Sequence, residues 1–395
     1  MVPNGWKRKP LVQVAEVRTG VAKGKQGLKD PIEVPYLRVA NVQDGHIDLS
    51  EVKKISIERH QLERYLLRKG DVLMTEGGDF DKLGRGDVWQ SQIDPCLNQN
   101  HVFAVRVNEA ILEPYFLAAL SGSHYGKSYF LSCAKRSTNL ASINSTQLKE
   151  FPVLIPPLSE QRKIAKILST WDKAISTTER LIDNSKQQKK ALMQQLLTGK
   201  KRLLDNSGKR FEGEWSKVEL GKLLDYKQPT PYLVKSTDYS DEYSTPVLTA
   251  GKTFILGYSN ENFGIFEEEL PAIIFDDFTT ASKFVDFPFK AKSSAMKILV
   301  AKQGVSIKFV YEAMQVLNYP VGGHQRHWIS IFANLVIGLP SPPEQQKIAS
   351  VLSNADKEIE LLEQQLTDLK QEKKALMQQL LTGKRRVKID EKEVA

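Results

Sequence analysis

Few side chains in this 395-residue chain have the spacing that a reaction centre requires. Gly251-Lys252-Thr253 resembles the end of a phosphate-binding loop, but Pro246 occupies the position of its first glycine, and proline has no backbone N–H to donate to a phosphate. His324 and His327 have a short metal-like spacing without an identifiable third ligand. No glycine-rich dinucleotide fingerprint follows a strand, and no Asn- or Asp-Pro-Pro-aromatic tetrapeptide suggests an amino-methyltransferase. The sequence therefore predicts no catalytic centre and no metal site.

Polar, glycine-bearing loops with basic and amide side chains are the chemistry that remains. Such side chains read base edges and hold phosphates. In the first half of the chain the candidate DNA-binding residues are Lys82, Arg85, Gln99, Asn100, His101, Lys135, Arg136, Thr138 and Asn139. In the second half they are Lys252, Thr279, Thr280, Lys283, Lys292, Ser293, Ser294, Gln325, Arg326 and His327. Any one of them alone could be an ordinary solvated residue, but both halves carry such a set.

The net charge points to the same partner. With 56 basic and 47 acidic residues the chain has a formal charge of +9 and a pI near 9.2, which favours a polyanion such as nucleic acid. The alternative is a small excess spread thinly over a large surface. The excess is uneven, because residues 160–202 hold 11 basic and 4 acidic side chains, whereas residues 203–343 hold 14 and 16. We therefore expect the isolated chain to bind DNA weakly.

Composition excludes several other classes of protein. The two cysteines, Cys96 and Cys133, are too few for a disulfide framework or a cysteine-based zinc site, and we expect both to be reduced and buried. The first ten residues lack the apolar centre of a secretory signal, and no run of about 18 apolar residues occurs. We expect a cytoplasmic protein without a membrane span.

An internal repeat determines the architecture. The segment beginning at Glu160 recurs at Glu344, and at the same offset residues 189–200 recur without a single change as residues 373–384. Each copy begins after a proline-rich stop, ends at Gly199 or Gly383, and contains no proline or glycine between these limits. Each copy therefore predicts one long helix.

Apolar residues in both copies follow a 4,3 spacing for about five heptads, which is typical of a coiled coil. The predicted seam consists of Ile164, Leu168, Trp171, Ile175, Ile182, Leu192 and Leu196 in the first copy, and of Ile348, Leu352, Ala355, Ile359, Leu362, Leu366, Leu369, Leu376 and Leu380 in the second. A lysine stands at the same seam position in each copy, Lys189 and Lys373. The alternative is two separate amphipathic helices on different cores.

Between the helices lie segments with short β-type runs and one or two helices each. If the second segment is compact with neighbouring ends, the two long helices run antiparallel and form a spacer about 60 Å long. The predicted fold is α+β, with two domains in pseudo-twofold arrangement on an antiparallel two-helix coiled coil. The predicted boundaries are a first domain at 1–157, a spacer helix at 158–202, a second domain at 203–341, a spacer helix at 342–388 and a tail at 389–395.

Taken together, these motifs give the chain a family likeness. It resembles the specificity (S) subunit of type I restriction-modification systems over nearly its whole length. The likeness rests on the repeated helix starts Pro156-Pro157-Leu158-Ser159-Glu160-Gln161 and Pro340-Ser341-Pro342-Pro343-Glu344-Gln345, and on the domain segments 70–74, 83–85, 99–103, 250–253, 274–280 and 292–296. The double helix start is the more specific feature, since the domain segments vary with the DNA sequence that is recognised.

The resemblance implies a non-catalytic reader of double-stranded DNA with two target recognition domains, one for each half of a bipartite, asymmetric site. It also implies two modification (methyltransferase) subunits docked on the helical regions, with restriction (translocase-nuclease) subunits added. S-adenosylmethionine, ATP and Mg would then be bound by those partners and not by this chain. The alternatives are the specificity subunit of another restriction-modification class, a modification-only system, or a two-headed protein-interaction scaffold.

Overall fold

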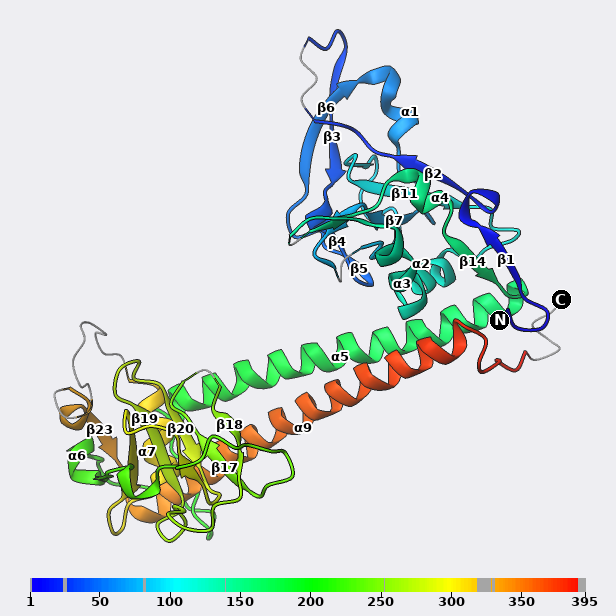
Figure 1. The fold of residues 1–395 in the computed structure, drawn as a ribbon. Coiled ribbons are helices and arrows are strands. Elements are labelled where there is room, and N and C mark those ends of the chain that lie inside the picture. Colours follow the sequence, from blue (N-terminus) through cyan, green and yellow to red (C-terminus); the bar gives the residue numbers. More distant parts are fainter. Residues whose placement is uncertain are drawn as a thin grey trace. The chain divides into compact units, whose positions relative to one another are not determined.

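The computed structural model describes residues 2–23, 27–80, 83–138, 140–251, 253–317, 328 and 331–389. They divide into two compact units (Figure 1). Unit 1 comprises Met1–Glu179 with Gln364–Ala395, and unit 2 comprises Arg180–Glu363. The two long helices, α5 (Leu158–Leu196) and α9 (Pro342–Leu380), each contribute to both units.

Unit 1 combines short strands with short helices. The strands are β1 (Lys7–Pro10), β2 (Ala15–Thr19), β3 (Pro31–Leu37), β4 (Val42–Gln43), β5 (His46–Ile47), β6 (Lys53–Glu58), β7 (Val72–Thr75), β8 (Gly77–Gly78), β9 (Gly86–Val88), β10 (Leu97–Asn98), β11 (Val102–Val107), β12 (Lys135–Arg136), β13 (Ala141–Ser142) and β14 (Pro152–Ile155). The helices are α1 (Leu62–Tyr65), α2 (Pro114–Gly122), α3 (His124–Cys133) and α4 (Ser145–Lys149).

Unit 2 is built in the same way. Its strands are β15 (Ser216–Glu219), β16 (Leu224–Lys227), β17 (Thr245–Leu248), β18 (Ile255–Ser259), β19 (Ala272–Asp276), β20 (Ser282–Val285), β21 (Lys290–Ala291), β22 (Met296–Ala301) and β23 (Val336–Leu339). Its short helices include α6 (Leu220–Leu223) and α7 (Ile307–Gln315). Strands β7 and β19 are fully buried, which explains why both read as unbroken apolar runs.

The two largest sheets of each unit have the same topology, and unit 1 has the small sheets β12-β13-β8 and β4-β5 in addition. A four-stranded antiparallel sheet has the order β2-β11-β7-β9 in unit 1 and β16-β22-β19-β20 in unit 2. A three-stranded sheet, β10-β3-β6 or β18-β17-β21, contains one parallel pair in each case. The repeat therefore extends to the domains, where the sequences show little similarity beyond their openings.

A two-stranded ribbon joins the start of each domain to its end. β1 pairs antiparallel with β14 in unit 1, and β15 pairs antiparallel with β23 in unit 2. The chain thus enters and leaves each domain at neighbouring points. Helix α5 begins three residues after β14, and α9 begins three residues after β23.

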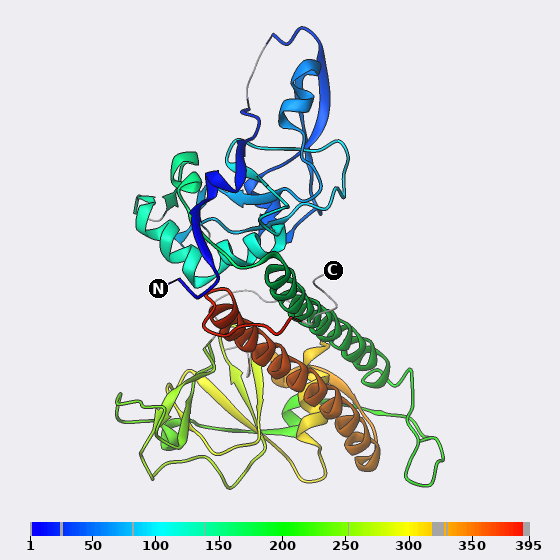
Figure 2. The ribbon, with the colours of Figure 1, turned by 90° about the vertical axis from the view of Figure 1, so that its right-hand side faces the viewer.

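The long helices lie side by side and antiparallel within each unit (Figure 2). In unit 1, Lys370 pairs with Glu179 at 2.8 Å and Lys373 pairs with Asp172. In unit 2, Lys186 of α5 pairs with Glu363 of α9 at 2.7 Å. Rising residue numbers on one helix thus meet falling numbers on the other. The predicted α+β class with two domains and an antiparallel pair of long helices is confirmed.

Every residue of the predicted seam is buried or half-buried. The ends of the seam are the most buried parts, because they also belong to the domain cores. Ile164 and Leu168 share the core of unit 1 with Leu380, while Leu196 shares the core of unit 2 with Ile348. Burying a side chain of this size stabilises a fold by about 1.5–3 kcal/mol. Each domain core is therefore completed by the first turns of one long helix and the last turns of the other.

Both cysteines are free, but only Cys96 is buried, and burial raises the pKa of its thiol to about 12. Cys133 is half-buried near the end of α3, so the expectation that both are buried was wrong for this residue. In the part of the chain that the structure describes, no helix is long and apolar enough to cross a membrane.

Candidate nucleic-acid interface

In each unit, most of the described candidate residues lie at one edge of the four-stranded sheet. In unit 1 this edge is formed where β2 and β7 end and β9 and β11 begin, and we call residues 19–21, 76, 85 and 99–101 the loop edge of unit 1. In unit 2, β19 ends and β20 and β22 begin at the matching edge, and residues 277–281 and 292–295 form the loop edge of unit 2. Loops at one sheet edge can present their side chains to a single ligand.

The strand registers make the two loop edges comparable residue by residue. Thr75 lies opposite Val102 in unit 1, and Asp276 lies opposite Met296 in unit 2. Counting back from Val102 and Met296 therefore places Asn100 in the position of Ser294. By the same count, Gln99 corresponds to Ser293. The sequence had nominated both pairs of residues without showing that they are equivalent.

A carboxylate orients the imidazole at the loop edge of unit 1. His101 Nδ1 lies 2.5 Å from Glu76 Oε2, and its Nε2 lies 3.5 Å from Asn100 Nδ2. Because the amide nitrogen is a donor, this arrangement fits a ring that donates from Nδ1 to Glu76 and accepts at Nε2. The imidazole remains 56% exposed, whereas Glu76 is 30% exposed. Glu76 thus fixes the orientation in which the exposed ring and the Asn100 amide can meet a base edge.

Basic side chains lie on strands and loops tied to this edge. β8 follows Glu76 and pairs with β13, which pairs with β12, and so Lys135 and Arg136 are exposed on the same small sheet. Arg136 donates to the Leu131 carbonyl at 2.8 Å, and its guanidinium lies 6.0 Å from the ring centre of Phe80. Thr138 is exposed in the turn that follows.

Arg85 is the half-buried cation of the loop edge. Its carbonyl accepts from the Thr75 amide at 3.0 Å, which fixes its backbone beside β7. Its Nε is buried and, among the residues that the structure describes, has no hydrogen-bond partner. A buried guanidinium nitrogen without a partner is costly unless a ligand supplies an acceptor.

The loop edge of unit 2 carries hydroxyl and ammonium groups. Lys283 is exposed on β20, and Ser293, Ser294 and Thr279 are exposed in loops. Lys292 is half-buried and donates to the Tyr239 hydroxyl at 3.0 Å. Thr280 differs from the other candidates because it is buried and its hydroxyl donates to the Thr279 carbonyl at 2.6 Å. Its place is thus inside the turn and not on its surface.

Six predicted residues lie outside the described part of the chain. They are Lys82, Asn139, Lys252, Gln325, Arg326 and His327. Sequence reasoning in turn did not nominate Glu76 or Tyr239. Their partners, His101 and Lys292, are 25 and 53 residues away along the chain, so no local spacing could have revealed them.

The repeated Glu-Gln pair forms a junction between each long helix and its unit. Glu160 accepts from Arg386 Nε at 2.6 Å and Nη2 at 2.7 Å and from Trp6 Nε1 at 3.2 Å. Glu344 makes the same contacts with Arg202, at 2.5 and 2.7 Å, and with Trp215 Nε1 at 3.2 Å. Hydrogen bonds from the guanidinium to the carboxylate raise the pKa of each arginine.

The glutamines of these junctions cap the domain helices. Gln161 accepts from the Glu113 amide at 2.8 Å and donates to the Pro156 carbonyl at 2.8 Å. Gln345 accepts from the Ser306 amide at 2.9 Å and donates to the Pro340 carbonyl at 2.8 Å. The repeated sequence therefore makes one structural joint twice, which explains why Glu and Gln recur together.

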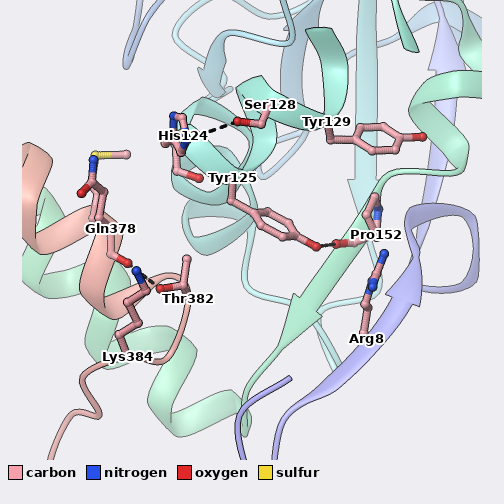
Figure 3. A pocket seen from close by; sticks show the side chains of 11 residues that line it. Arg8, His124, Tyr125, Ser128, Tyr129, Pro152, Gln378, Thr382 and Lys384 are labelled. Carbon is pink, nitrogen blue, oxygen red and sulfur yellow. Dashed lines mark hydrogen bonds between the residues drawn. The ribbon is translucent and has the colours of Figure 1, made fainter. Parts of the chain in front are cut away.

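Each unit has a hollow beside its junction. In unit 1 a pocket of about 640 Å³ lies among β1, α3 and the last turn of α9, where Arg8, Tyr125 and Lys384 line it (Figure 3). In unit 2 a pocket of about 860 Å³ lies among β15, β23 and the end of α5, with Lys217 and Thr198 in its lining. Arg8 of β1 and Lys217 of β15 occupy matching positions, each two residues after its tryptophan, so the two pockets share part of their lining.

Comparison with known proteins agrees with this architecture. Residues 3–186 and 212–371 match the family described as "Type I restriction modification DNA specificity domain". The chain is 29% identical over 415 residues to the putative type I restriction enzyme MjaX specificity subunit of Methanocaldococcus jannaschii. This match covers 98% of this chain and 95% of that protein. It is 49% identical over 147 residues to the EcoR124I/EcoR124II specificity subunit of Escherichia coli, a match that spans only 36% of each chain.

Solved structures show the same fold. The S subunit of a type I restriction-modification system from M. genitalium superposes with a TM-score of 0.62 at 14% identity, over 96% of this chain and 97% of that one. A chain from a structure that describes complex assembly and conformational transition of the type I R-M system gives a TM-score of 0.57 at 16% identity, over 98% and 100%. With two matched segments that together span most of its length, this chain belongs to the family of type I restriction-modification specificity subunits.

Proposed function

We propose that this chain reads a bipartite, asymmetric sequence in double-stranded DNA and directs methyltransferase and restriction subunits to it, without catalysing a reaction itself. The observation that carries the proposal is the pair of loop edges, which have the same strand topology and different side chains. One edge presents Asn100 and an oriented His101, and the other presents Ser294 and Thr279. Different donors and acceptors select different bases, so the two half-sites should differ.

The long helices support the division of the site into two halves. Each has 39 residues and is therefore about 58 Å long. We propose that the helix pair sets the number of base pairs between the half-sites, so that the intervening DNA is measured and not read. Centres some 35–50 Å apart would correspond to roughly 10–15 base pairs, at about 34–36 Å per helical turn.

The junctions support the proposal about protein partners. Two equivalent Glu-Arg-Trp joints, with pockets whose linings match in part, suit two copies of one partner docked on the helical regions. We propose that the two copies are the modification subunits and that restriction subunits join that complex. S-adenosylmethionine, ATP and Mg would be bound by those subunits, and the complex would work in the cytoplasm, where the DNA is.

DNA binding by the complex with the methyltransferase subunit tests this function. We expect affinity for a duplex with both half-sites to fall by orders of magnitude between 50 and 200 mM salt, about 10³-fold for six or more phosphate contacts. Complete absence of DNA affinity in that complex would leave the protein-interaction scaffold as the function. If the complex binds DNA and the host has no restriction subunit, the chain belongs to a modification-only system.

A further inference from the structure

Phe278 is a large apolar side chain exposed on the loop edge of unit 2. It is 54% exposed, and it belongs to none of the hydrophobic clusters formed by the described residues. A single exposed apolar residue is ordinary on a protein surface. The position of Phe278 and the hydrogen-bonded turn that carries it set it apart from that ordinary case.

The turn that carries Phe278 is closed by hydrogen bonds. The Phe278 amide donates to Asp276 Oδ1 at 2.9 Å, and the Thr279 hydroxyl donates to Asp276 Oδ2 at 2.6 Å. The Thr280 amide donates to the Asp276 carbonyl at 2.9 Å. Thr280 has φ of +62°, a conformation that persists only where the surroundings fix it. These bonds fix the backbone from which the Phe278 side chain projects.

The other exposed phenylalanine rings near charged loops are covered by cations. The Phe80 ring in unit 1 is stacked by Arg136, and the Phe263 ring in unit 2 lies 4.5 Å from Lys290 Nζ and 4.9 Å from Lys235 Nζ. Among the described residues, neither a ring nor a cation stacks on Phe278. In the register of unit 1 the equivalent position is Gly77. Unit 1 thus has no ring at the position of Phe278.

We infer that Phe278 determines specificity by contacting the 5-methyl group of a thymine in the major groove, an inference that rests on the proposed reading of DNA by the loop edges. Its neighbours at this edge, Thr279, Lys292 and Ser294, offer hydrogen bonds and charge. The ring offers only apolar surface. Of the four bases, thymine alone presents an apolar group at its major-groove edge, and phenylalanine is a known partner for it.

A duplex in which single thymines are replaced by deoxyuridine tests the contact directly, because only the methyl group is lost. The second half-site is first mapped with the wild-type complex of this chain and the methyltransferase subunit. Replacing one thymine there should weaken wild-type binding about fourfold, the equivalent of one buried methyl group. Phe278→Ala should bind the thymine and deoxyuridine duplexes equally, and Phe278→Leu should retain part of the preference.

Leu256→Ala is the matched control. Leu256 is 41% exposed on β18, which belongs to the three-stranded sheet and not to the sheet that carries the loop edge, and its replacement should leave the preference for thymine unchanged. All variants should bind the first half-site as the wild type does, which shows that they are folded.

The inference is overturned if the second half-site contains no thymine, if no replacement affects wild-type binding, or if Phe278→Ala keeps the preference. 2-Aminopurine in the duplex fluoresces more strongly when its stacking is broken. A rise in this fluorescence at a base step where deoxyuridine does not affect binding would show that the Phe278 ring inserts between bases instead. Loss of all DNA binding by the wild-type complex would refute the proposed function itself.

Discussion

Glu160 and Glu344 each bind an arginine and a tryptophan, but the two ion pairs differ in how far they are exposed to solvent. The side chain of Glu344 is fully buried and that of Arg202 is 19% exposed, whereas the corresponding values for Glu160 and Arg386 are 4% and 44%. Removing one partner of a buried ion pair leaves the other charge without compensation, which is strongly destabilising. The two joints therefore provide a matched pair of sites.

We predict that Arg202→Met lowers the free energy of unfolding by about 3 kcal/mol, because Glu344 is left buried with only the Trp215 indole as a donor from this trio. Urea denaturation followed by tryptophan fluorescence measures the loss. Arg386→Met is the control and should have a smaller effect, since solvent reaches its site. An equal or larger loss for Arg386→Met would contradict the role assigned to burial.

A second prediction at the residue scale concerns His101. His101→Ala should weaken binding to the first half-site by about 1–3 kcal/mol, the range for a good base contact, and should relax the preference at one base pair. Glu76→Gln removes the carboxylate that orients the ring and should reduce that preference by less. Competition binding with single-base variants of both half-sites measures both effects. A loss of equal size at every sequence would instead indicate a phosphate contact.

Among the helices and strands, the long helices were the most predictable from sequence. The 4,3 spacing from Ile164 to Leu196 is a local pattern, and a local pattern is sufficient to predict a helix and its buried face. The pairing of Thr75 with Val102, and thus the loop edge, depends on contacts between distant segments that no spacing reveals. For the same reason the candidate residues could be grouped by type but not by position, and Thr280 was nominated although it is buried.

The same Asp-Lys pair joins the two long helices in both units, but its surroundings differ. Asp356 of α9 binds Lys189 at 2.5 Å and Lys308 of α7 at 2.8 Å, and both lysines also contact the fully buried Glu312. In unit 1, Asp172 and Lys373 repeat the helix pair. The shared caps of Gln161 and Gln345 align Lys308 with Tyr115 and Glu312 with Ala119, so the additional charges are absent there.

This network predicts a dependence of stability on pH. Burial raises the pKa of Asp356, but hydrogen bonds from Lys189 and Lys308 outweigh it and hold the pKa below the ordinary value of 3.8. A carboxyl with a lowered folded pKa contributes stability above its unfolded pKa and loses it as the pH falls through the folded one. Asp356→Asn should therefore destabilise unit 2 equally at pH 7 and pH 5, with the difference from wild type shrinking below about pH 4.

Thermal unfolding across this pH range measures the effect, with Asp172→Asn as the matched control. Asp172 occupies the same repeat position but has one lysine partner in place of two. It should cause the smaller loss at pH 7. A difference between wild type and Asp356→Asn that grows towards pH 3 would contradict the sign of the predicted dependence.

At the scale of the whole molecule, the proposed function assigns recognition to the units and spacing to the helices. Inserting one heptad at facing positions of α5 and α9 keeps the seam and lengthens the pair by about 10.5 Å, or roughly three base pairs. We predict a longer spacer with both half-sites unchanged, as measured by selection of bound duplexes from a randomised pool. Altered half-sites would show that the helices take part in reading the bases.

Replacing residues 203–341 with the corresponding segment of a relative separates the two readers. The ribbon of β15 and β23 brings the ends of this segment together, so that the exchange leaves the long helices in place. We predict that one half-site changes while the other half-site and the spacer stay the same. A change in both half-sites would mean that the two loop edges do not read independently.

Mapping of methylated bases in host DNA, with and without this gene, tests the central claim most directly. Two loop edges with different side chains predict a methylated motif of two different half-sites, separated by a spacer of fixed length and arbitrary sequence. The motif should disappear when the gene is deleted and the methyltransferase gene is kept. A single continuous motif, or methylation that does not change when the gene is removed, would contradict the account.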